Sequence, residues 1–297
     1  MTSAPAPVEV SPSRVADVEG FAVRRALPQR ARRTVGAWCF VDHLGPVVTP
    51  PGPAMSIGPH PHMGLHTVTW LFHGEVEHRD SLGSAQLIRP GQLNLMTAGH
   101  GIAHAEEAPS GWSGTAHGAQ IWVAQPEATR HGEPAFEHHA ELPTLGSGPA
   151  EVTVLVGGFG GAVSPARHDT PLVGLDVVCA PGQIALPLDE SFEHALIVVE
   201  GQVRLEGTVV EPGTLAYVPT GRAELPIATD VVSRFLVLGG PPFGEEVLMW
   251  WNFVARTRDE VVDAIDDWQG ETARFGHVAT GLDRIAAPRP HWATAGS

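Results

Sequence analysis

The chain has 297 residues and a formal net charge of -15 at pH 7. This acidic balance argues against binding to nucleic acid or to an anionic membrane surface, because both require basic patches. No segment approaches the roughly 20 apolar residues that cross a bilayer, and the first ten residues lack the pattern of a secretory signal. We therefore expect a cytoplasmic protein whose partner is a small molecule or another protein.

Residues 1–19 are expected to form a flexible tail, and strand signals then continue from residue 20 to about residue 250. The strand-like segments are short, rich in β-branched and aromatic residues, and separated by glycine or proline. This spacing is typical of all-β folds made of antiparallel sandwiches or barrels. The clearest segments are 67–72, 86–88, 93–96, 120–123, 152–156, 173–179, 195–199, 203–205 and 234–238.

An internal repeat predicts that one barrel occurs twice. Residues 67–74 align with residues 194–201, and residues 90–99 then fall on residues 212–221. Both later segments begin with Pro-Gly, have a leucine two residues after that glycine, and end on a further glycine. Such self-similarity indicates a duplicated unit.

A single helix is predicted near the C-terminus. Thr257 to Glu260 fits a capping box, and Val261, Val262, Ile265 and Trp268 follow at helical spacing. The repeat pattern breaks at residues 145–149, which are rich in glycine. The predicted domains are therefore 20–145 and 146–290, with the helix in the second domain and a tail at 291–297.

The two cysteines, Cys39 and Cys179, both lie in apolar stretches. A secreted scaffold held together by disulfides would carry more cysteines than this. We expect two buried thiols.

The candidate metal ligands occur in two alternating pairs, His60 with His62 and His104 with Glu106. Alternate residues of an extended strand point to the same face, so each pair can converge on one ion. Three imidazoles and a carboxylate suit Fe(II), Mn, Co, Ni, Cu or Zn, and they leave one or two positions open for a substrate or dioxygen. The alternative is that these residues pack independently in loops.

Other histidines crowd the same region, namely His66, His73, His78, His100 and His117. His66 is a candidate to orient a metal ligand or to bind the substrate, and an imidazole half-buried in the pocket wall is the equal alternative. His100, which is flanked by glycines, is a candidate for the mouth of the pocket. Asp80 is expected to pair with Arg79 or to anchor a turn.

The repeat also compares the two candidate sites. Where the first copy has the four ligands, the alignment places Pro187, Asp189, Pro226 and Ala228 in the second copy. Proline and alanine side chains cannot bind a metal. The second barrel is therefore predicted to be free of metal, with a structural or regulatory role.

Several segments resemble signature blocks of the pirin family, which are bicupins of the cupin superfamily. The strongest resemblance is in GPHPHMGLHTVT, HRDSLG and MTAGHGIAHAE, and further resemblance lies in VGAWCFVDHLGP and WWNFVAR. These segments are residues 58–69, 78–83, 96–106, 35–46 and 250–256.

The resemblance implies two tandem cupin, jelly-roll-like β-barrels, with a metal, usually iron, in the N-terminal one. The family's ligand positions correspond to His60, His62, His104 and Glu106. Bacterial members can show quercetin 2,3-dioxygenase activity, whereas the eukaryotic namesake is a nuclear transcriptional co-regulator. Many members have Arg where this chain has Met63, Glu or Ala at the position of His66, and Arg at the position of His100, so these three residues are candidates for a changed pocket.

Two main functions follow as hypotheses. The first is a metal-dependent dioxygenase that acts with dioxygen on a flavonol, quercetin-like, or a related enolic aromatic substrate. In that reaction Glu106 accepts the proton of the substrate hydroxyl. The second is a regulatory protein without turnover, whose metal or redox state alters binding to a protein partner. A storage or structural protein with a vestigial site is a third alternative.

Overall fold

The structure is a computed structural model that describes residues 6–49 and 56–293. Its contacts divide the chain into two compact units. Of the described residues, one unit contains 139–243 with the N-terminal segments 6–16 and 22–43, and the other contains 17–21, 44–49, 56–138 and 244–293. The chain passes between these units within β2 (Arg14–Val18), β3 (Phe21–Leu27) and β4 (Trp38–Thr49).

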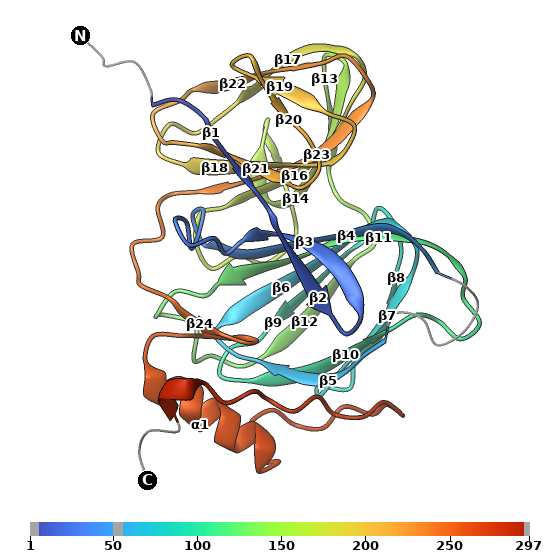
Figure 1. Ribbon diagram of the computed structural model, residues 1–297, viewed down its shortest axis with the longest axis vertical. Helices are drawn as coiled ribbons and strands as arrows, with labels where there is room; N and C mark the ends of the chain where they lie inside the picture. The colour runs from blue at the N-terminus through green and yellow to red at the C-terminus, as the bar shows by residue number, and fades with distance from the viewer. Residues whose placement is uncertain (1–5, 50–55, 294–297) are drawn as a thin grey trace. The chain divides into compact units, whose positions relative to one another are not determined.

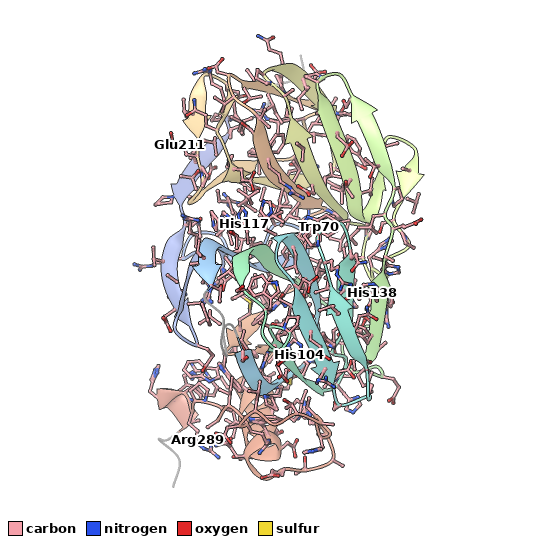
Figure 2. All side chains as sticks on the ribbon, turned by 90° about the vertical axis from the view of Figure 1, so that its right-hand side faces the viewer. Trp70, His104, His117, His138, Glu211 and Arg289 are labelled. Atoms are coloured by element: carbon pink, nitrogen blue, oxygen red, sulfur yellow. The ribbon has the colours of Figure 1, made fainter. Side chains whose placement is uncertain are left out.

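Residues 56–139 form a barrel of two antiparallel sheets, which we call the first barrel. Its strand orders are β5-β10-β7-β8 and β12-β9-β6-β11, and the second sheet continues from β11 through β4, β3 and β2 (Figure 1). Figure 2 marks His104 among the side chains of this barrel. The strands are β5 (Ser56–His62), β6 (Leu65–His73), β7 (Val76–Asp80), β8 (Ala85–Ile88), β9 (Leu93–Thr97), β10 (Ile102–Glu107), β11 (Gly114–Ala124) and β12 (Ala135–His139).

The second barrel repeats this plan. One sheet has the order β17-β22-β19-β20, and the other has β1-β21-β18-β23-β16-β14-β13, with β15 paired to β14. Its interior is a continuous apolar core that includes Leu196, Val198, Phe235 and Val237. The strands are β1 (Glu9–Pro12), β13 (Thr144–Ser147), β14 (Ala150–Phe159), β15 (Ala162–Val163), β16 (Val173–Cys179), β17 (Gly182–Pro187), β18 (Glu193–Glu200), β19 (Val203–Leu205), β20 (Thr208–Val210), β21 (Thr214–Val218), β22 (Glu224–Thr229) and β23 (Ser233–Gly240).

The strand registers support the predicted duplication. Thr67 of β6 lies opposite Met96 of β9, and His194 of β18 lies opposite Val218 of β21. Those are the pairs that the alignment of residues 67–74 with 194–201 requires. The fold class of two tandem all-β barrels with a short C-terminal helix is thus confirmed.

One detail of the alignment is wrong by two residues. In β5 and β10 His60 lies opposite His104, whereas in β17 and β22 the residue opposite Pro226 is Ala185. The counterparts of His60 and His62 are therefore Ala185 and Pro187, and not Pro187 and Asp189. The loop after β17 caused the shift, because sequence spacing alone does not set strand register. A metal-free second barrel remains a prediction, since neither Ala185 nor Pro187 can serve as a ligand.

The C-terminal segment packs with the first barrel, which differs from the predicted division at residue 145. Helix α1 (Arg258–Gln269) buries Val261, Ala264, Ile265 and Trp268. These side chains share one apolar cluster with Met63, which follows β5, and with Ala103 and Ala105 of β10. Phe253 belongs to the same cluster and lies in the hairpin of β24 (Leu248–Trp250) and β25 (Phe253–Ala255). An amphipathic helix is stabilised when its apolar face is buried against another apolar surface. The small alanine side chains of β10 provide such a surface for α1.

The N-terminal cap of α1 has one of the two hydrogen bonds of the predicted capping box. The Thr257 hydroxyl accepts a hydrogen bond from the backbone N–H of Glu260 at 3.2 Å. The Glu260 carboxylate accepts from the N–H of Arg256 at 3.0 Å, one residue before the expected position. It also accepts two hydrogen bonds from Arg130, so the cap is tied to the first barrel.

The predicted tails are shorter than expected. Residues 9–12 form β1, which pairs with β21, and residues 14–18 form β2. Residues 291–293 form a short 3-10 helix, η1 (His291–Ala293). The rest of the predicted tails includes residues 1–5 and 294–297, which lie outside the described residues. Cys39 and Cys179 are buried thiols, as predicted.

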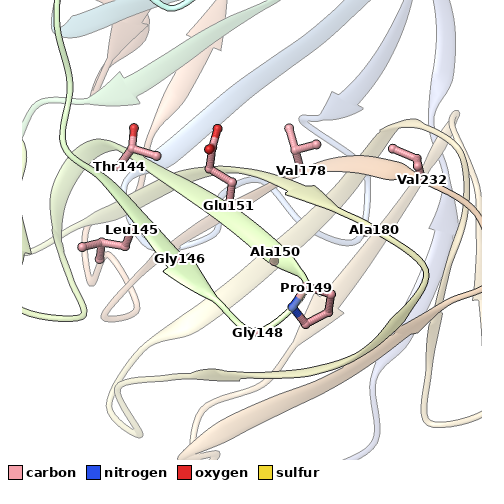
Figure 3. Close-up of a pocket in the computed structure, with 10 residues that line it drawn as sticks. All are labelled: Thr144, Leu145, Gly146, Gly148, Pro149, Ala150, Glu151, Val178, Ala180 and Val232. Carbon is pink, nitrogen blue, oxygen red and sulfur yellow. The ribbon is translucent and has the colours of Figure 1, made fainter.

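Among the described residues no helix is long and apolar enough to span a membrane. A shallow depression of about 580 Å³ lies along β13 and β14 of the second barrel (Figure 3). Its walls are mostly glycine, alanine and valine, and Glu151 is the one charged residue that lines it.

Candidate metal centre

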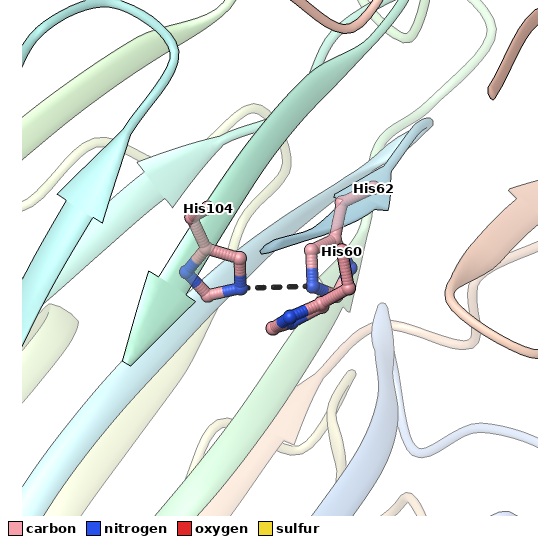
Figure 4. A group of neighbouring side chains, drawn as sticks. All are labelled: His60, His62 and His104. Carbon is pink, nitrogen blue, oxygen red and sulfur yellow. Dashed lines mark hydrogen bonds between the residues drawn. The ribbon is translucent and has the colours of Figure 1, made fainter. Parts of the chain in front are cut away.

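Three histidines of the first barrel converge on one point. His60 and His62 end β5, and His104 lies on the neighbouring strand β10, opposite His60. One ring nitrogen from each residue lies within 4.8 Å of the other two. The Nε2 atoms of His62 and His104 are 3.1 Å apart (Figure 4). The alternation predicted for the two segments therefore brings three of the four expected ligands together.

The three imidazoles are buried and neutral at physiological pH. Their exposed fractions are 7% for His60 and 1% each for His62 and His104. Burial lowers the pKa of His60 to about 4, and burial together with the neighbouring histidines holds the pKa values of His62 and His104 well below the usual range. A neutral imidazole keeps a lone pair on one nitrogen, which is the form that binds a metal.

Hydrogen bonds determine which nitrogen of His60 carries that lone pair. The Nδ1 atom lies 2.9 Å from the carbonyl oxygen of Gly58. Because a carbonyl only accepts hydrogen bonds, Nδ1 carries the proton and Nε2 has the lone pair.

His104 is oriented by a chain of two further buried side chains on β7. Its Nδ1 lies 3.3 Å from Nδ1 of His78, and Nε2 of His78 lies 3.1 Å from Oδ2 of Asp80. The carboxylate fixes the His78 proton on Nε2, so Nδ1 of His78 accepts from Nδ1 of His104. The lone pair of His104 is then on Nε2, the nitrogen that faces His62. The ring of Phe136 stacks on His78 with centroids 4.3 Å apart.

Asp80 anchors a turn, which is one of the two roles predicted for it. Its Oδ1 accepts from the backbone N–H groups of Leu82 and Ser84 at 2.9 and 3.0 Å. Burial raises the pKa of Asp80, but the hydrogen bonds from His78 and Ser84 outweigh it and leave the pKa below its usual value. Arg79 pairs with Glu77 at 2.5 Å and not with Asp80, because the side chains of neighbouring strand residues point to opposite faces.

Glu106 lies on the same face of β10 as His104, opposite His78 of β7. Its carboxylate oxygens are not among the ligand atoms that converge at the three histidines. Its Oε1 is 3.5 Å from the hydroxyl oxygen of Thr69, and that oxygen lies 2.9 Å from Oε1 of Gln120. Burial raises the pKa of Glu106 above the usual value, and His78 and Thr69 lower it in part. Glu106 is thus a carboxylate beside the three histidines, and its role as a ligand stays a prediction.

The three other predicted pocket residues lie in different settings. His66 is buried and bonds through Nδ1 to the hydroxyl of Thr97 at 2.9 Å, on the face of β6 opposite Thr69. His100 has its Nδ1 3.2 Å from the carbonyl of Gly132. Met63 is buried in the cluster beneath α1, and its sulfur accepts a hydrogen bond from Arg274 at 3.2 Å. Their roles at the pocket stay predictions.

The sequence contains a local signal for His78 and Asp80. His78-Arg79-Asp80 has the same alternating pattern as the two ligand pairs. What the sequence does not give is the pairing of β7 with β10, which brings that pair next to His104.

The donor set fits a divalent transition metal. Three buried neutral imidazoles, two of them held in a defined tautomer, are the ligands that Fe, Ni, Cu and Zn accept. Trp122 packs edge-on against His62 with centroids 5.2 Å apart, so an apolar wall borders the site.

Comparisons with known proteins agree with this geometry. Residues 20–123 match the family model described as Pirin, and residues 175–276 match the model described as Pirin C-terminal cupin domain. A Pseudomonas aeruginosa protein provisionally named as a quercetin 2,3-dioxygenase is 45% identical over 275 residues, which cover 92% of this chain and 87% of that protein.

Solved structures also show similarity to this family. A crystal structure of quercetin 2,3-dioxygenase from Acinetobacter baumannii has a TM-score of 0.93 at 42% identity, and the match covers 95% of both chains. The bacterial pirin YhhW from Escherichia coli, solved in complex with nickel(II), has a TM-score of 0.63 at 19% identity and covers 80% of this chain and all of its own. At that identity YhhW supports the fold alone.

Proposed function

Since the chain belongs to the pirin family of bicupins, we propose that it is a metal-dependent dioxygenase that acts on a flavonol or a related enolic aromatic substrate. The observation that carries the proposal is the convergence of His60, His62 and His104 inside the first barrel. The likeness to the quercetin 2,3-dioxygenase from Acinetobacter baumannii supports the substrate class.

His60, His62 and His104 would hold the metal through three nitrogens, with Glu106 as the fourth ligand. The bound metal supplies Lewis-acid chemistry toward the substrate hydroxyl and redox chemistry toward dioxygen. Fe(II) is the metal that we assign, because the resemblance to the pirin family implies iron and three imidazoles with one carboxylate suit it. Mn, Co, Ni, Cu and Zn accept the same ligands.

Glu106 would accept the proton of the substrate hydroxyl. Burial raises the pKa of this carboxyl, so its ionised form is a stronger base than an exposed glutamate. The Thr69 hydroxyl, 3.5 Å from Oε1, limits where the carboxylate can point.

The chain of His78 and Asp80 contributes orientation. It holds His104 with its Nδ1 protonated, so the Nε2 lone pair is available without a prior proton transfer. The three histidines also lie on two paired strands, which are rigid supports for a site that must keep its geometry.

The experiment is aerobic quercetin consumption by the iron-loaded full chain, measured together with metal content. The variant is Glu106→Gln, and the matched control is Glu107→Gln, because Glu107 accepts a hydrogen bond from Thr280 at 2.6 Å and points away from the site. Loss of a general base lowers turnover by about 10² to 10⁴-fold. We expect that loss for Glu106→Gln and no loss for Glu107→Gln. Absence of flavonol consumption by the iron-loaded wild-type chain would contradict the proposal.

A further inference from the structure

The second barrel contains a cavity of about 470 Å³, which falls within the range of roughly 300 to 1,000 Å³ that small-molecule sites have. Leu175, Leu186 and Val237 line its inner part, and these residues belong to the apolar core of the barrel. Phe159, Val163, Pro171 and Phe192 are among the residues that line the remainder. The cavity is therefore an opening into the interior of the barrel with mainly apolar walls.

Only three of the residues that line this cavity have polar side chains, namely His168, Asp189 and His194. Asp189 accepts hydrogen bonds from the backbone N–H and the hydroxyl of Ser191 at 2.8 and 2.6 Å. These bonds hold the pKa of Asp189 below its usual value, so it is ionised at neutral pH. Its negative charge disfavours an anionic ligand.

His194 is the polar group that the protein leaves unsatisfied. Its side chain is 98% buried, since its exposed fraction is 2%, and its Nδ1 has no hydrogen-bond partner within the described part of the chain. An unsatisfied buried polar atom costs about 1 to 3 kcal/mol, so a native protein seldom keeps one without a reason. Burial also lowers the pKa of His194 to about 4, and the ring is therefore neutral at physiological pH.

The repeat shows how the second barrel accommodates the ring of His194. In the first barrel Trp122 lies opposite Thr67 and packs on His62. In the second barrel the corresponding pair is His194 and Gly239. The His194 ring itself occupies the space that the absence of a side chain at Gly239 leaves, since a Cβ atom there would lie 2.3 Å from Cδ2 of His194. The Cδ2 edge of the imidazole therefore rests on Gly239, and Nδ1 is on the opposite edge of the ring.

The depression along β13 and β14 does not combine apolar walls with a buried polar atom that lacks a hydrogen-bond partner. Its residues Val178 and Val232 are 37% and 65% exposed, and the one charged residue is Glu151 (Figure 3). A shallow surface without a buried polar group gives little basis for recognition.

We propose that the cavity of the second barrel binds a neutral aromatic molecule that carries a hydroxyl group, with the rings against the apolar walls and the hydroxyl on the imidazole of His194. The apolar lining favours a flat hydrocarbon body, the neutral imidazole takes a hydrogen bond, and Asp189 selects against a carboxylate. This site is separate from the three-histidine centre, and the proposal does not depend on the proposed enzymatic activity.

The test is isothermal titration of the full chain with 2-naphthol, and 2-methoxynaphthalene serves as the analogue that cannot donate a hydrogen bond. The first variant is Val163→Trp, which fills the mouth of the cavity at a residue that is 67% exposed and so should not disturb folding. Its matched control is Val209→Trp, at an exposed valine of the same barrel outside the cavity. The second variant is His194→Leu, which removes the imidazole.

We expect Val163→Trp to weaken 2-naphthol binding by more than tenfold and Val209→Trp to leave it unchanged. A neutral hydrogen bond contributes about 0.5 to 1.5 kcal/mol, so we expect His194→Leu and the methoxy analogue each to bind about 2- to 10-fold more weakly. His104→Ala should not change the affinity, which distinguishes this cavity from the centre in the first barrel. Absence of 2-naphthol binding to the wild type, equal binding in Val163→Trp, or equal binding in His194→Leu would overturn the proposal.

Discussion

Asp80→Asn is the substitution that tests how the centre is oriented, because it changes one atom that reaches the ring of His104 only through His78. In the native chain Oδ1 of Asp80 accepts from Leu82 and Ser84, while Oδ2 faces Nε2 of His78. In the variant the turn retains the amide oxygen, since both of its partners are backbone donors. The amide nitrogen then faces Nε2 of His78.

Two donors cannot share one contact, so His78 is expected to move its proton from Nε2 to Nδ1. The Nδ1 of His104, 3.3 Å away, must then accept, and the proton of His104 moves to Nε2. That is the nitrogen that should bind the metal. Every change lies among buried side chains, because the exposed fractions of the His78 and Asp80 side chains are 4% and 0%.

The expected loss follows from these contacts. A hydrogen bond to a charged group contributes about 1.5 to 3 kcal/mol, and removing such a partner of a ligand histidine lowers metal affinity about 10- to 100-fold. The assay is competition between the protein and a chromophoric chelator for zinc, which serves as a redox-inert probe. The control is Asp17→Asn, since Asp17 also caps a turn by accepting from the backbone N–H of Gly20 at 3.0 Å. Zinc affinity of Asp80→Asn within twofold of the wild type, with an unchanged melting temperature, would refute the orienting role.

Three further predictions concern stability. Ile265→Ala should lower the free energy of unfolding by about 2 to 5 kcal/mol in a urea titration, because Ile265 is fully buried beneath α1, and a loss below 1 kcal/mol would contradict the docking of this helix. Thr257→Ala should cost about 1 kcal/mol through loss of the cap on Glu260, and Thr257→Ser should restore most of it. The wild type should become less stable as the pH falls from 6.5 to 4, because burial lowers the pKa of His194 to about 4 and only the unfolded chain then binds that proton. Between pH 7.5 and pH 5 the titration of His194 should lower the free energy of unfolding by about 2 kcal/mol. The variant His194→Gln should lack this loss, while Asp189 and His168 in the same cavity are unchanged. Equal pH dependence of stability in the wild type and the variant would exclude the effect.

Much of the centre could be predicted from local pattern. His60, His62 and His104 were identified because alternation along a strand decides which side chains share a face, and this rule does not depend on the partner strand. The duplication is also visible in the sequence, since the Pro-Gly pair, the leucine and the last glycine have the same spacing within residues 90–99 and 212–221.

Other features depend on pairing between distant strands. The contact of His78 with His104 requires β7 to lie beside β10 in one register, and a two-residue shift between β5 and β17 was invisible for the same reason. The position of α1 on the first barrel follows from the small side chains Ala103 and Ala105, which carry no recognisable signal alone. Strand β1 has no recognisable signal in the sequence, because a four-residue segment containing proline gains its stability from pairing with β21.

The ligand role of Glu106 is where pattern and geometry differ most. The residue faces the same side as His104, yet its carboxylate contacts Thr69 and does not join the converging nitrogens. Strand alternation fixes only the face to which a side chain points and not its rotamer.

X-ray absorption spectroscopy of the iron-loaded full chain tests the central claim most directly. The account predicts one iron per chain with three imidazole nitrogens at roughly 2.0 to 2.2 Å, and loss of bound iron in His60→Ala, His62→Ala and His104→Ala. A metal shell without imidazole scattering, or full iron content in any of these variants, would contradict it.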